Sequence, residues 1–411
     1  MNYLKIAMVI LPVSLTACNK TLIDGNPNVN LNPKQSNLMS KGNTNSNIPS
    51  GQMLTISKVE DIGMPKVQLY PDSVYTSYDL KDNAFTHLPP GYEDQIVSFR
   101  LPKGYMAVFA ENSDGTGESV CYVAVNGAIN ANLPERLRNK ISYIRYMAVN
   151  NPDKQGTASL SNAAVQAFKM QWFYGWSINR PSFQNQQFVP MTFGKGAAND
   201  QNVKYLIDRN DIDHLLSFNE PDNATQSNIP NIDTAVARYK IMQKSGLRLG
   251  APATTQGQVF AAGSWLSRFM AKAAEQKARI DFIPIHWYDW GNQTNNQVSD
   301  SLTAEFIFTR FKTYVQKVHN TYPAQAIWIT EYNANPNRHS AIVHEYFMKL
   351  STDWMNSTPW IERYAYFFPA TVPGVNADYS LTSVGKYWNS LTSGKSFQAN
   401  IVSNDTVLNP E

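Results

Sequence analysis

The feature that most constrains the fold of this chain is the alternation of strand-length apolar runs with helix-like segments after residue 150. Eight runs predict strands: Gln155–Leu160, Met170–Trp176, Phe188–Phe193, Leu215–Phe218, Arg248–Ala251, Phe282–Trp287, Ile327–Thr330 and Arg363–Phe368. Helix-like segments between them include Asn162–Phe168, Thr234–Lys244, Ser264–Gln276, Thr303–Thr321 and Ile342–Met355. Eight strand–helix repeats over about 240 residues predict an α/β fold and, more narrowly, a (β/α)8 TIM barrel over residues 151–395. No Gly-rich dinucleotide fingerprint follows any run, which disfavours an open doubly wound sheet.

A smaller all-β domain is predicted over residues 58–150. Short β-type runs separated by Pro, Gly, Asn and Asp occur at Val67–Tyr70, Ile96–Phe99, Tyr105–Phe109, Val120–Val125 and Ile141–Tyr146. In addition, the segment Tyr92–Phe99 repeats the spacing and character of Leu137–Ile144. This duplication resembles the paired Greek keys of βγ-crystallin-like domains.

The crystallin resemblance implies a Ca²⁺ site in each copy, built from acidic, Asn and hydroxyl oxygens. Both copies depart from that pattern. Val97 stands where a ligating hydroxyl is expected, and Arg138 stands where an acid or Asn is expected, although the second copy keeps Asn139 and Ser142. A structural β-sandwich is therefore the expectation, and structural calcium is the alternative.

The first residues predict export and a lipid anchor. Lys5 precedes an apolar run, Ile6–Ser14, that is too short to cross a bilayer. The run ends in Leu15-Thr16-Ala17-Cys18, which resembles the lipobox of bacterial lipoproteins. The resemblance implies a signal peptide over residues 1–18 and membrane attachment through a diacylated Cys18. The expected location is the bacterial cell surface or outer membrane.

Two further segments are expected to lie outside the domains. Residues 19–57 are dense in Asn, Ser, Pro, Lys and Gly, which predicts a disordered tether. Residues 396–411 are expected to form a C-terminal tail. The chain has two cysteines, so acylation of Cys18 leaves Cys121 without a partner for a disulfide. The apolar neighbours of Cys121 predict a buried, inert thiol.

Composition argues against one class of partner. The formal net charge is only +3 and there is no basic stripe, so nucleic-acid binding is not expected. Aromatic residues make up 12% of the chain, but such side chains fill cores as well as stacking on sugar rings. Their positions therefore carry more information than their number.

Acidic side chains stand where predicted strands end. Glu220 follows the fourth strand and Glu331 follows the seventh. In a closed barrel these strands lie on opposite sides of the axis, so the two glutamates can face each other across a substrate. Hydrolysis of a glycosidic bond needs such a pair, one acid for the leaving oxygen and one carboxylate for the anomeric carbon or its water. The sequence has no His/Cys cluster, Ser–His–Asp arrangement or phosphate loop, so neither a metal nor a cofactor is expected.

Six motifs, in order along the chain, resemble glycoside hydrolase family 128, endo-β-1,3-glucanases. They are Trp172–Trp176, Phe188–Met191, Phe218–Asn223, Leu249–Ala253, Asp281–Tyr288 and Trp328–Glu331. The resemblance covers residues 151–395 and implies an endo-acting, retaining hydrolase of β-1,3-glucan. Two alternatives stay open: a non-catalytic glucan-binding surface lipoprotein, and a hydrolase of the same clan that acts on another β-glucan or mannan. A monomer is expected.

The resemblance also implies roles for matching residues. Glu220 would be the general acid and then the base, and Glu331 would be the nucleophile. Asn219 would bind the sugar 2-hydroxyl. Tyr288, with His286 beside it, would hold Glu331 in place.

Aromatic residues are expected to bind the sugar rings. The candidates are Trp176, Trp287, Trp290 and, on strand eight, Tyr366, where the family often places a Trp. Trp287 has the core as its alternative, because neighbours on a strand point in opposite directions. Of the other acids nearby, Asp222 is expected to cap a helix or loop and Asp289 to line an outer subsite.

Overall fold

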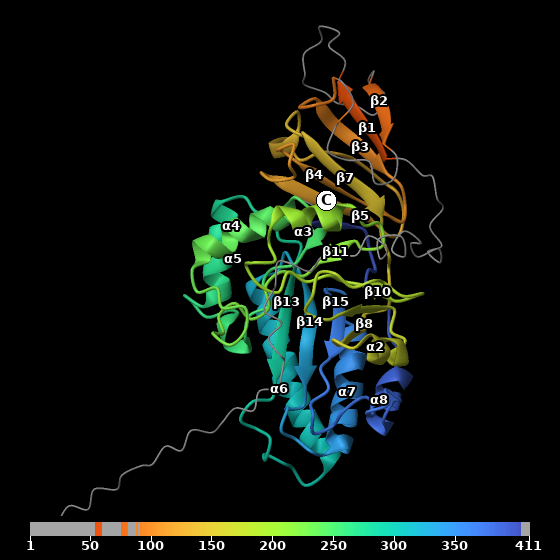
Figure 1. Cartoon of the computed structure of the whole chain (residues 1–411), viewed down its shortest axis with the longest axis vertical. Coiled ribbons are helices and arrows are strands. Elements are labelled where there is room, and N and C mark those ends of the chain that lie inside the picture. Colours follow the sequence, from red (N-terminus) through yellow and green to blue (C-terminus); the bar gives the residue numbers. More distant parts are fainter. Residues whose placement is uncertain (1–53, 60–74, 81–87, 89–90, 404–411) are drawn as a thin grey trace, which may run out of the picture. The chain divides into compact units, whose positions relative to one another are not determined.

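The computed structural model describes residues 54–59, 75–80, 88 and 91–403 (Figure 1). The predicted signal peptide, Cys18, most of the tether and the expected strand Val67–Tyr70 lie outside these residues. No helix in the described part of the chain is both long and apolar enough to span a bilayer.

From residue 151 onward the chain is built on parallel strands. Six strands pair in the order β10-β9-β8-β15-β14-β13, and β11 and β12 form a separate parallel pair. The strands are β8 Gln155–Ala158, β9 Trp172–Tyr174, β10 Gln187–Phe188, β11 His214–Leu215, β12 Arg248–Leu249, β13 Phe282–Tyr288, β14 Ala326–Asn333 and β15 Ile361–Tyr366. Each of the eight expected strands overlaps one of them. Single parallel bridges, Met191 with Leu216 and Gly250 with Phe282, lie between the β11–β12 pair and the two outer strands of the larger sheet.

Seven α-helices of this α/β domain are described, and each begins at a side-chain cap. They are α2 Asn162–Phe168, α3 Asp200–Ile207, α4 Ile232–Gln243, α5 Trp265–Glu275, α6 Asp300–Thr321, α7 Ala341–Asn356 and α8 Ser383–Ser390. The preceding residue is Ser, Thr or Asn, and its side chain accepts an N–H of the first turn. The sequence pattern does not predict α3 or α8, because each is a short segment rich in polar residues.

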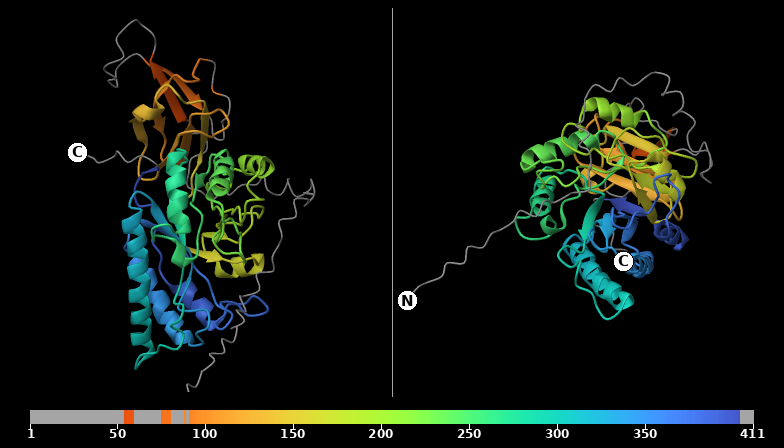
Figure 2. Two further views of the ribbon diagram at one scale, coloured as in Figure 1. Left: turned by 90° about the vertical axis from the view of Figure 1, so that its left-hand side faces the viewer. Right: turned by 60° about the horizontal axis from the view of Figure 1, so that its bottom comes forward.

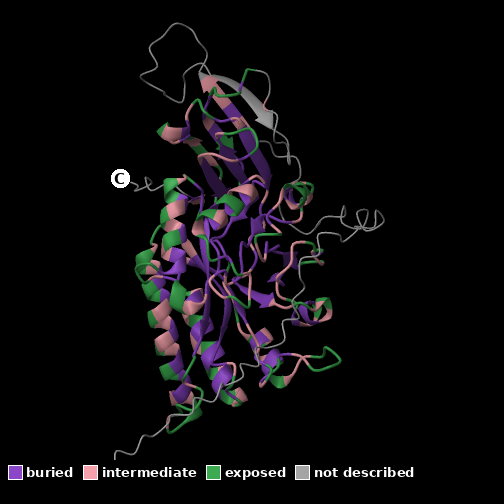
Figure 3. Ribbon diagram, turned by 60° about the vertical axis from the view of Figure 1, so that its left-hand side comes forward, coloured by how far each residue is buried: buried purple, intermediate pink, exposed green. Residues whose placement is uncertain are grey.

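The helices cover the strands. Helices α6 and α7 lie side by side along β13, β14 and β15 (Figure 2). The strands of the sheet are buried, whereas the helices alternate between buried and exposed sides (Figure 3). This arrangement explains why the strands are buried on both faces and why their sequences do not alternate between apolar and polar residues.

The β domain consists of two four-stranded antiparallel sheets, ordered β2-β1-β3-β6 and β16-β5-β4-β7. Its strands are β1 Leu54–Val59, β2 Tyr75–Leu80, β3 Ile96–Leu101, β4 Tyr105–Ala110, β5 Ser119–Ala124, β6 Ile129–Asn132, β7 Tyr143–Ala148 and β16 Ile401–Ser403. Side chains of both sheets share one core, in which the rings of Phe99 and Tyr122 lie 4.6 Å apart between centroids. The domain is therefore a sandwich.

The internal repeat of the sequence has a structural counterpart. The order β2-β1-β3 recurs as β5-β4-β7. Asp94 and Asn139 are equivalent in the two copies, and both have left-handed backbones, with φ of 54° and 57°. Their N–H groups make reciprocal hydrogen bonds of 3.0 Å, from Asp94 to the carbonyl of Ile141 and from Asn139 to that of Ile96. The two copies therefore contact each other in the same way.

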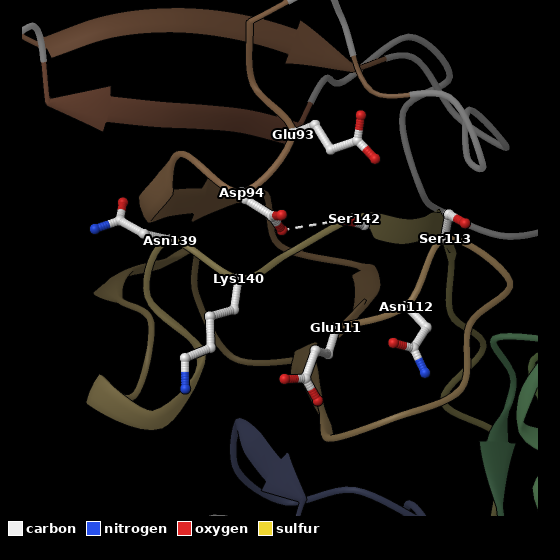
Figure 4. A pocket seen from close by; sticks show the side chains of 8 residues that line it. All are labelled: Glu93, Asp94, Glu111, Asn112, Ser113, Asn139, Lys140 and Ser142. Carbon is white, nitrogen blue, oxygen red and sulfur yellow. Dashed lines mark hydrogen bonds between the residues drawn. The ribbon is translucent and has the colours of Figure 1, made fainter.

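A surface pocket of about 380 Å³ lies beside this reciprocal contact (Figure 4). Its lining residues are Glu93, Asp94, Glu111, Asn112, Ser113, Asn139, Lys140 and Ser142. The Ser142 hydroxyl donates to Asp94 at 3.0 Å, so polar groups of both copies meet here. Lys140 adds a positive charge to the three carboxylates. The calcium alternative stays a prediction.

Two expected boundaries are wrong. β1 begins at Leu54, within the expected tether, and both Leu54 and Ile56 are fully buried. β16 lies in the expected C-terminal tail and pairs with β5 from Ile401 to Ser403. β16 has only three residues, so its own sequence gives little signal, and it forms because β5 is already present to pair with it. The first four of the six residues of β1 alternate between apolar and polar, so its sequence does carry a strand signal within the expected tether.

Arg145 of β7 connects the β domain to the α/β domain. Its side chain is fully buried and donates to the carbonyl oxygens of Arg209 at 2.9 Å, Leu206 at 3.3 Å and Ser245. Buried carbonyl groups that lose a charged donor retain the full cost of their desolvation. This one side chain therefore contributes strongly to the junction.

We expect Arg145→Met to lower the free energy of unfolding by about 3 kcal/mol, because it leaves buried carbonyl oxygens without a donor. Urea denaturation of the full chain measures the change. Arg100→Met is the control, since Arg100 is exposed on β3, and it should change the value by less than about 0.5 kcal/mol. Equal losses in the two variants would show that Arg145 has no special role.

Candidate active site

Glu220 follows β11 at a sharp turn of the backbone. Asn219 makes a parallel bridge with Ala253, which keeps the chain extended up to that point. Glu220 then has a left-handed backbone with φ of 42°. Its N–H donates to the carbonyl of Ala253 at 2.6 Å, and its own carbonyl accepts from the N–H of Asn223 at 3.0 Å. A non-glycine residue in this conformation costs about 1–2 kcal/mol, and such residues concentrate at functional sites.

Glu331 lies within β14, beside His286 of β13. The pairing of the two strands shifts register after Ile285, and this shift places His286 directly opposite Glu331. β14 continues to Asn333, so Glu331 precedes the strand end, whereas the expected strand ends at Thr330. A register shift of this kind changes the face to which the following side chains point, without ending the pairing of the strands.

His286 lies between the two carboxylates. Its Nδ1 is 2.9 Å from Glu220 Oε1, and its Nε2 is 3.6 Å from Glu331 Oε1. Within the described part of the chain, these three side chains form a group that could hold a metal ion, with one ligand atom of each within 4.8 Å of the others. The shorter contact places the imidazole within hydrogen-bonding distance of the Glu220 carboxyl group, which is an arrangement suited to proton transfer.

Two donors hold Glu331. Trp176 Nε1 donates to Oε1 at 2.9 Å, and the Tyr288 hydroxyl donates to Oε2. Burial, and then the charge of Glu331, raise the pKa of Tyr288 well above its ordinary value, so the phenol stays protonated. Both contacts fit an ionised carboxylate, which only accepts hydrogen bonds.

A family model described as glycosyl hydrolase catalytic core matches residues 146–393, more than half of the chain. A crystal structure of a family 128 (subgroup I) endo-β-1,3-glucanase from Amycolatopsis mediterranei, a mutant in complex with laminarihexaose, is 30% identical. The likeness covers 58% of this chain and 100% of that chain, with a TM-score of 0.50. The chain belongs to glycoside hydrolase family 128.

A more distant likeness is to a family 128 (subgroup II) endo-β-1,3-glucanase from Pseudomonas viridiflava. That protein is 22% identical over 59% of this chain and 98% of its own, with a TM-score of 0.47. A search of curated proteins found no match.

The candidate active site of this glycoside hydrolase is open at Glu220 and nearly covered at Glu331. Their side chains are 13% and 2% exposed. The ring of Phe367 contacts those of Trp176 and Tyr288, at centroid distances of 5.6 and 6.3 Å. Aromatic rings therefore surround Glu331 and leave Glu220 in contact with solvent.

Trp290 lies at the edge of this aromatic group. Its ring centroid is 5.6 Å from that of Tyr288, and the residue is 47% exposed. A large apolar ring that remains half exposed beside a catalytic site is available for a ligand.

Trp287 does not lie in the site, and its expected stacking role is wrong. It is 3% exposed and packs against Phe311 of α6 and Phe347 of α7, at 5.2 and 5.9 Å between centroids. Its neighbours His286 and Tyr288 reach the two glutamates instead. Because successive strand residues point to opposite faces, Trp287 faces the helices and belongs to the core.

Tyr366 is also a core residue rather than a site residue. Its hydroxyl lies 2.6 Å from His344 Nδ1 and accepts from the N–H of Ala334 at 3.3 Å. The next residue, Phe367, faces Trp176 in the site instead. The sequence alone does not show whether Tyr366 or Phe367 faces the site. Every residue of β15 is buried, and its sequence does not alternate between apolar and polar residues.

Asn219 and the two nearby aspartates have defined environments. Asn219 is fully buried and donates to Gln226 at 3.2 Å, while its Oδ1 has no hydrogen-bond partner among the described residues. Asp222 accepts the N–H of Thr255 at 3.0 Å and so ties together the turns after β11 and β12. Asp289 is buried and forms an ion pair at 2.7 Å with the partly exposed Arg310 of α6, so the expectation of an outer subsite there is wrong.

Three residues of the site are not predicted from the sequence. Asn223 donates to Glu220 Oε2 at 3.2 Å. Tyr174 donates to the carbonyl of Thr330 at 2.9 Å, and burial, followed by the charge of Glu331, raises its pKa. The third is Phe367. The position of Asn223, three residues after Glu220, is a signal that could have revealed its contact. Tyr174 and Phe367 stand in apolar runs, whose pattern predicts core residues.

The burial of His344, which contacts Tyr366, predicts how the free energy of unfolding depends on pH. Burial lowers the pKa of His344 to about 4 from an ordinary value of 6.5. Between these values the unfolded chain binds a proton that the folded protein does not, so the stability present above pH 6.5 is lost as the pH falls toward 4. The loss should reach about 3 kcal/mol for this histidine. His214, whose pKa burial also lowers to about 4, adds a loss of the same sign.

Urea denaturation at several pH values tests this dependence. His344→Gln should show a smaller fall in the free energy of unfolding between pH 6.5 and pH 4 than the wild type. His339→Gln, at an exposed position nearby, should follow the wild-type curve. A His344→Gln curve parallel to the wild-type curve would refute the assignment.

Proposed function

We propose that this glycoside hydrolase is an endo-acting enzyme that cleaves β-1,3-glucan by double displacement, with retention of configuration. The observation that carries the proposal is the pair Glu220 and Glu331: one carboxylate oxygen of each lies within 4.8 Å of the other, around His286. Retaining glycosidases hold their carboxyl groups about 5–5.5 Å apart, and inverting ones about 6.5–9.5 Å apart. The 30% identical endo-β-1,3-glucanase in complex with laminarihexaose supports the substrate.

We infer further that the eight parallel strands close into a (β/α)8 barrel. The bridges between Met191 and Leu216 and between Gly250 and Phe282 support closure, since they join the β11–β12 pair to both ends of the larger sheet. In such a barrel, active-site residues stand at the carboxyl ends of the strands. Glu220 and Glu331 come from the fourth and seventh strands at that end.

The proposed reaction has two steps. In the first, the Glu331 carboxylate attacks the anomeric carbon, while Glu220 gives its proton to the departing glycosidic oxygen. In the second, Glu220 removes a proton from a water molecule, whose oxygen attacks the anomeric carbon and displaces Glu331. Trp176 and Tyr288 would keep Glu331 aligned for the attack, which needs the reacting atoms about 3–3.5 Å apart.

The surrounding groups fit a sugar chain. Trp176 and Phe367 offer rings close to Glu331, and Trp290 offers a half-exposed ring farther out. The Oδ1 atom of Asn219 is an acceptor that a sugar hydroxyl would satisfy. These features support subsites on both sides of the reacting bond.

For the remainder of the chain, the proposal follows the sequence patterns. The reciprocal bonds of Asp94 and Asn139 support a βγ-crystallin-like Greek-key domain. Export and attachment to a membrane through a lipidated Cys18, at the bacterial cell surface or outer membrane, rest on the lipobox pattern. The enzyme would then act as a monomer on polysaccharide near that membrane.

Glu220→Gln and Glu331→Gln should each lower kcat on laminarin by at least about 1,000-fold, because an amide neither donates the required proton nor attacks the anomeric carbon. Reducing-sugar release measures the rate, product sizes report endo or exo action, and melting temperature reports folding. A folded variant that keeps near wild-type turnover would end the proposal. Wild-type activity on mannan or another β-glucan alone, or binding without products, would favour the two alternatives.

Chemical rescue with azide separates the two roles. On an activated aryl glucoside, azide should restore Glu331→Gly by giving an α-glycosyl azide, since it then attacks in place of the nucleophile. The same reagent should restore Glu220→Gly by giving a β-glycosyl azide, because it replaces water in the second step. NMR of the products distinguishes these outcomes, and exchanged stereochemistry would exchange the assigned roles.

Trp290→Ala should raise KM for long glucans about tenfold with little change in kcat, because it removes a stacking surface worth about 1.4 kcal/mol. Tyr346→Ala is the matched control, since Tyr346 is another aromatic residue with a similar exposure, 46%, and lies on α7. It should leave KM unchanged. Trp287→Ala should instead destabilise the fold by about 3–5 kcal/mol. A Trp290→Ala variant with wild-type KM would remove this residue from the subsites.

A further inference from the structure

Asn223 contacts Glu220 twice, and the roles proposed above leave these contacts unexplained. Its Nδ2 donates to Glu220 Oε2 at 3.2 Å, and its backbone N–H donates to the Glu220 carbonyl at 3.0 Å. The second bond closes the turn that begins at the left-handed backbone of Glu220. One residue therefore fixes both the backbone and the carboxyl group of Glu220.

Thr225 determines which way the Asn223 amide points. The Oδ1 atom of Asn223 accepts from the Thr225 N–H at 3.0 Å and from the Thr225 hydroxyl at 2.9 Å. A backbone N–H can only donate, so the amide oxygen must face Thr225 and the NH₂ group must face Glu220. The orientation of this amide is thus fixed by its neighbours.

The two oxygens of Glu220 consequently have different partners. Oε1 lies 2.9 Å from His286 Nδ1, which donates or accepts according to the tautomer of the imidazole. Oε2 faces an NH₂ group, which only donates. A proton on Glu220 therefore cannot lie between Oε2 and Asn223, because two hydrogens would then point at each other.

We propose that Asn223 is a positioning residue that orients the Glu220 carboxyl group and favours its ionised form over its protonated form. A donor to a carboxylate stabilises the charge, so removing the Asn223 amide would favour the protonated form of Glu220. The amide itself favours the ionised base that the second step needs. This inference rests on the proposed function of Glu220 as acid and base.

Two substitutions test the inference through the pH profile of kcat/KM on laminarin. The alkaline limb of this profile reports the acid of the free enzyme. Asn223→Leu removes the donor, so the limb should move to higher pH by about one unit. Asn223→Asp keeps an oxygen for Thr225 but puts a second carboxylate against Glu220, so the limb should move further in the same direction.

Asn228→Gly is the matched control. Asn228 is an exposed asparagine in the same loop, and its φ of 45° suits glycine, so the wild-type profile should be retained. Melting temperatures establish that each variant is folded. If Asn223→Leu does not fold, Asn223→Asp carries the test alone, because it preserves the contacts with Thr225.

A double substitution separates failure of the inference from failure of the proposed function. Adding Asn223→Leu to Glu220→Gln should change kcat less than about twofold, because Asn223 acts through Glu220. If Glu220→Gln alone keeps wild-type turnover, the proposed function is wrong. If Glu220→Gln is inactive but the folded Asn223 variants keep the wild-type alkaline limb, or lose activity equally at every pH, Asn223 is only structural and the inference is wrong.

Discussion

The register shift between β13 and β14 is the constraint on which the rest of the site depends. Up to Ile285 the strands pair regularly, and without the shift His286 would lie opposite Thr330. Because side chains alternate between faces, one added residue moves every later side chain of β14 to the other face. Glu331 therefore shares a face with His286, and Tyr332 shares the helix-facing side with Trp287. Both of these aromatic residues pack against α6, which fixes the shift by core packing.

Local strain accompanies this arrangement. Glu220 and Trp176 both have left-handed backbones, with φ of 42° and 49°, and both contribute directly to the site. Such conformations persist only where the surroundings determine them, at about 1–2 kcal/mol each. Here the determining contacts are the bonds of Glu220 to Ala253 and Asn223, and the bond of Trp176 to Glu331. The hydrogen bonds that orient the carboxylates are therefore also the ones that hold the strained backbone.

The sequence predicts structure that repeats along the chain, such as the strand–helix units. It does not predict structure that depends on contacts between segments far apart in the sequence. The strand–helix alternation predicts each of the eight parallel strands that the structure describes, and the polar residues at strand ends point to Glu220 and Glu331 as the candidate pair. The face of an apolar strand is not predicted: β13 and β15 are buried throughout, so Trp287 could not be separated from its neighbours, nor Tyr366 from Phe367. β16 is missed for a related reason, since three residues become a strand only because β5 offers an edge. The contact of a side-chain amide such as Asn223 with Glu220 is not predicted, because it depends on the conformation of the turn that carries it.

The two carboxylates differ in ways that suit different roles. Glu331 is almost fully covered and accepts hydrogen bonds from Trp176 and from Tyr288, whose pKa is raised. Its carboxyl group is therefore held in one orientation, as a nucleophile requires. Glu220 is more exposed, and His286 can either give or receive a proton at Oε1. A group that must be protonated in one step and ionised in the next needs such a partner, and His286 lies closer to Glu220, at 2.9 Å, than to Glu331, at 3.6 Å. These contacts support the division of labour proposed for the two glutamates.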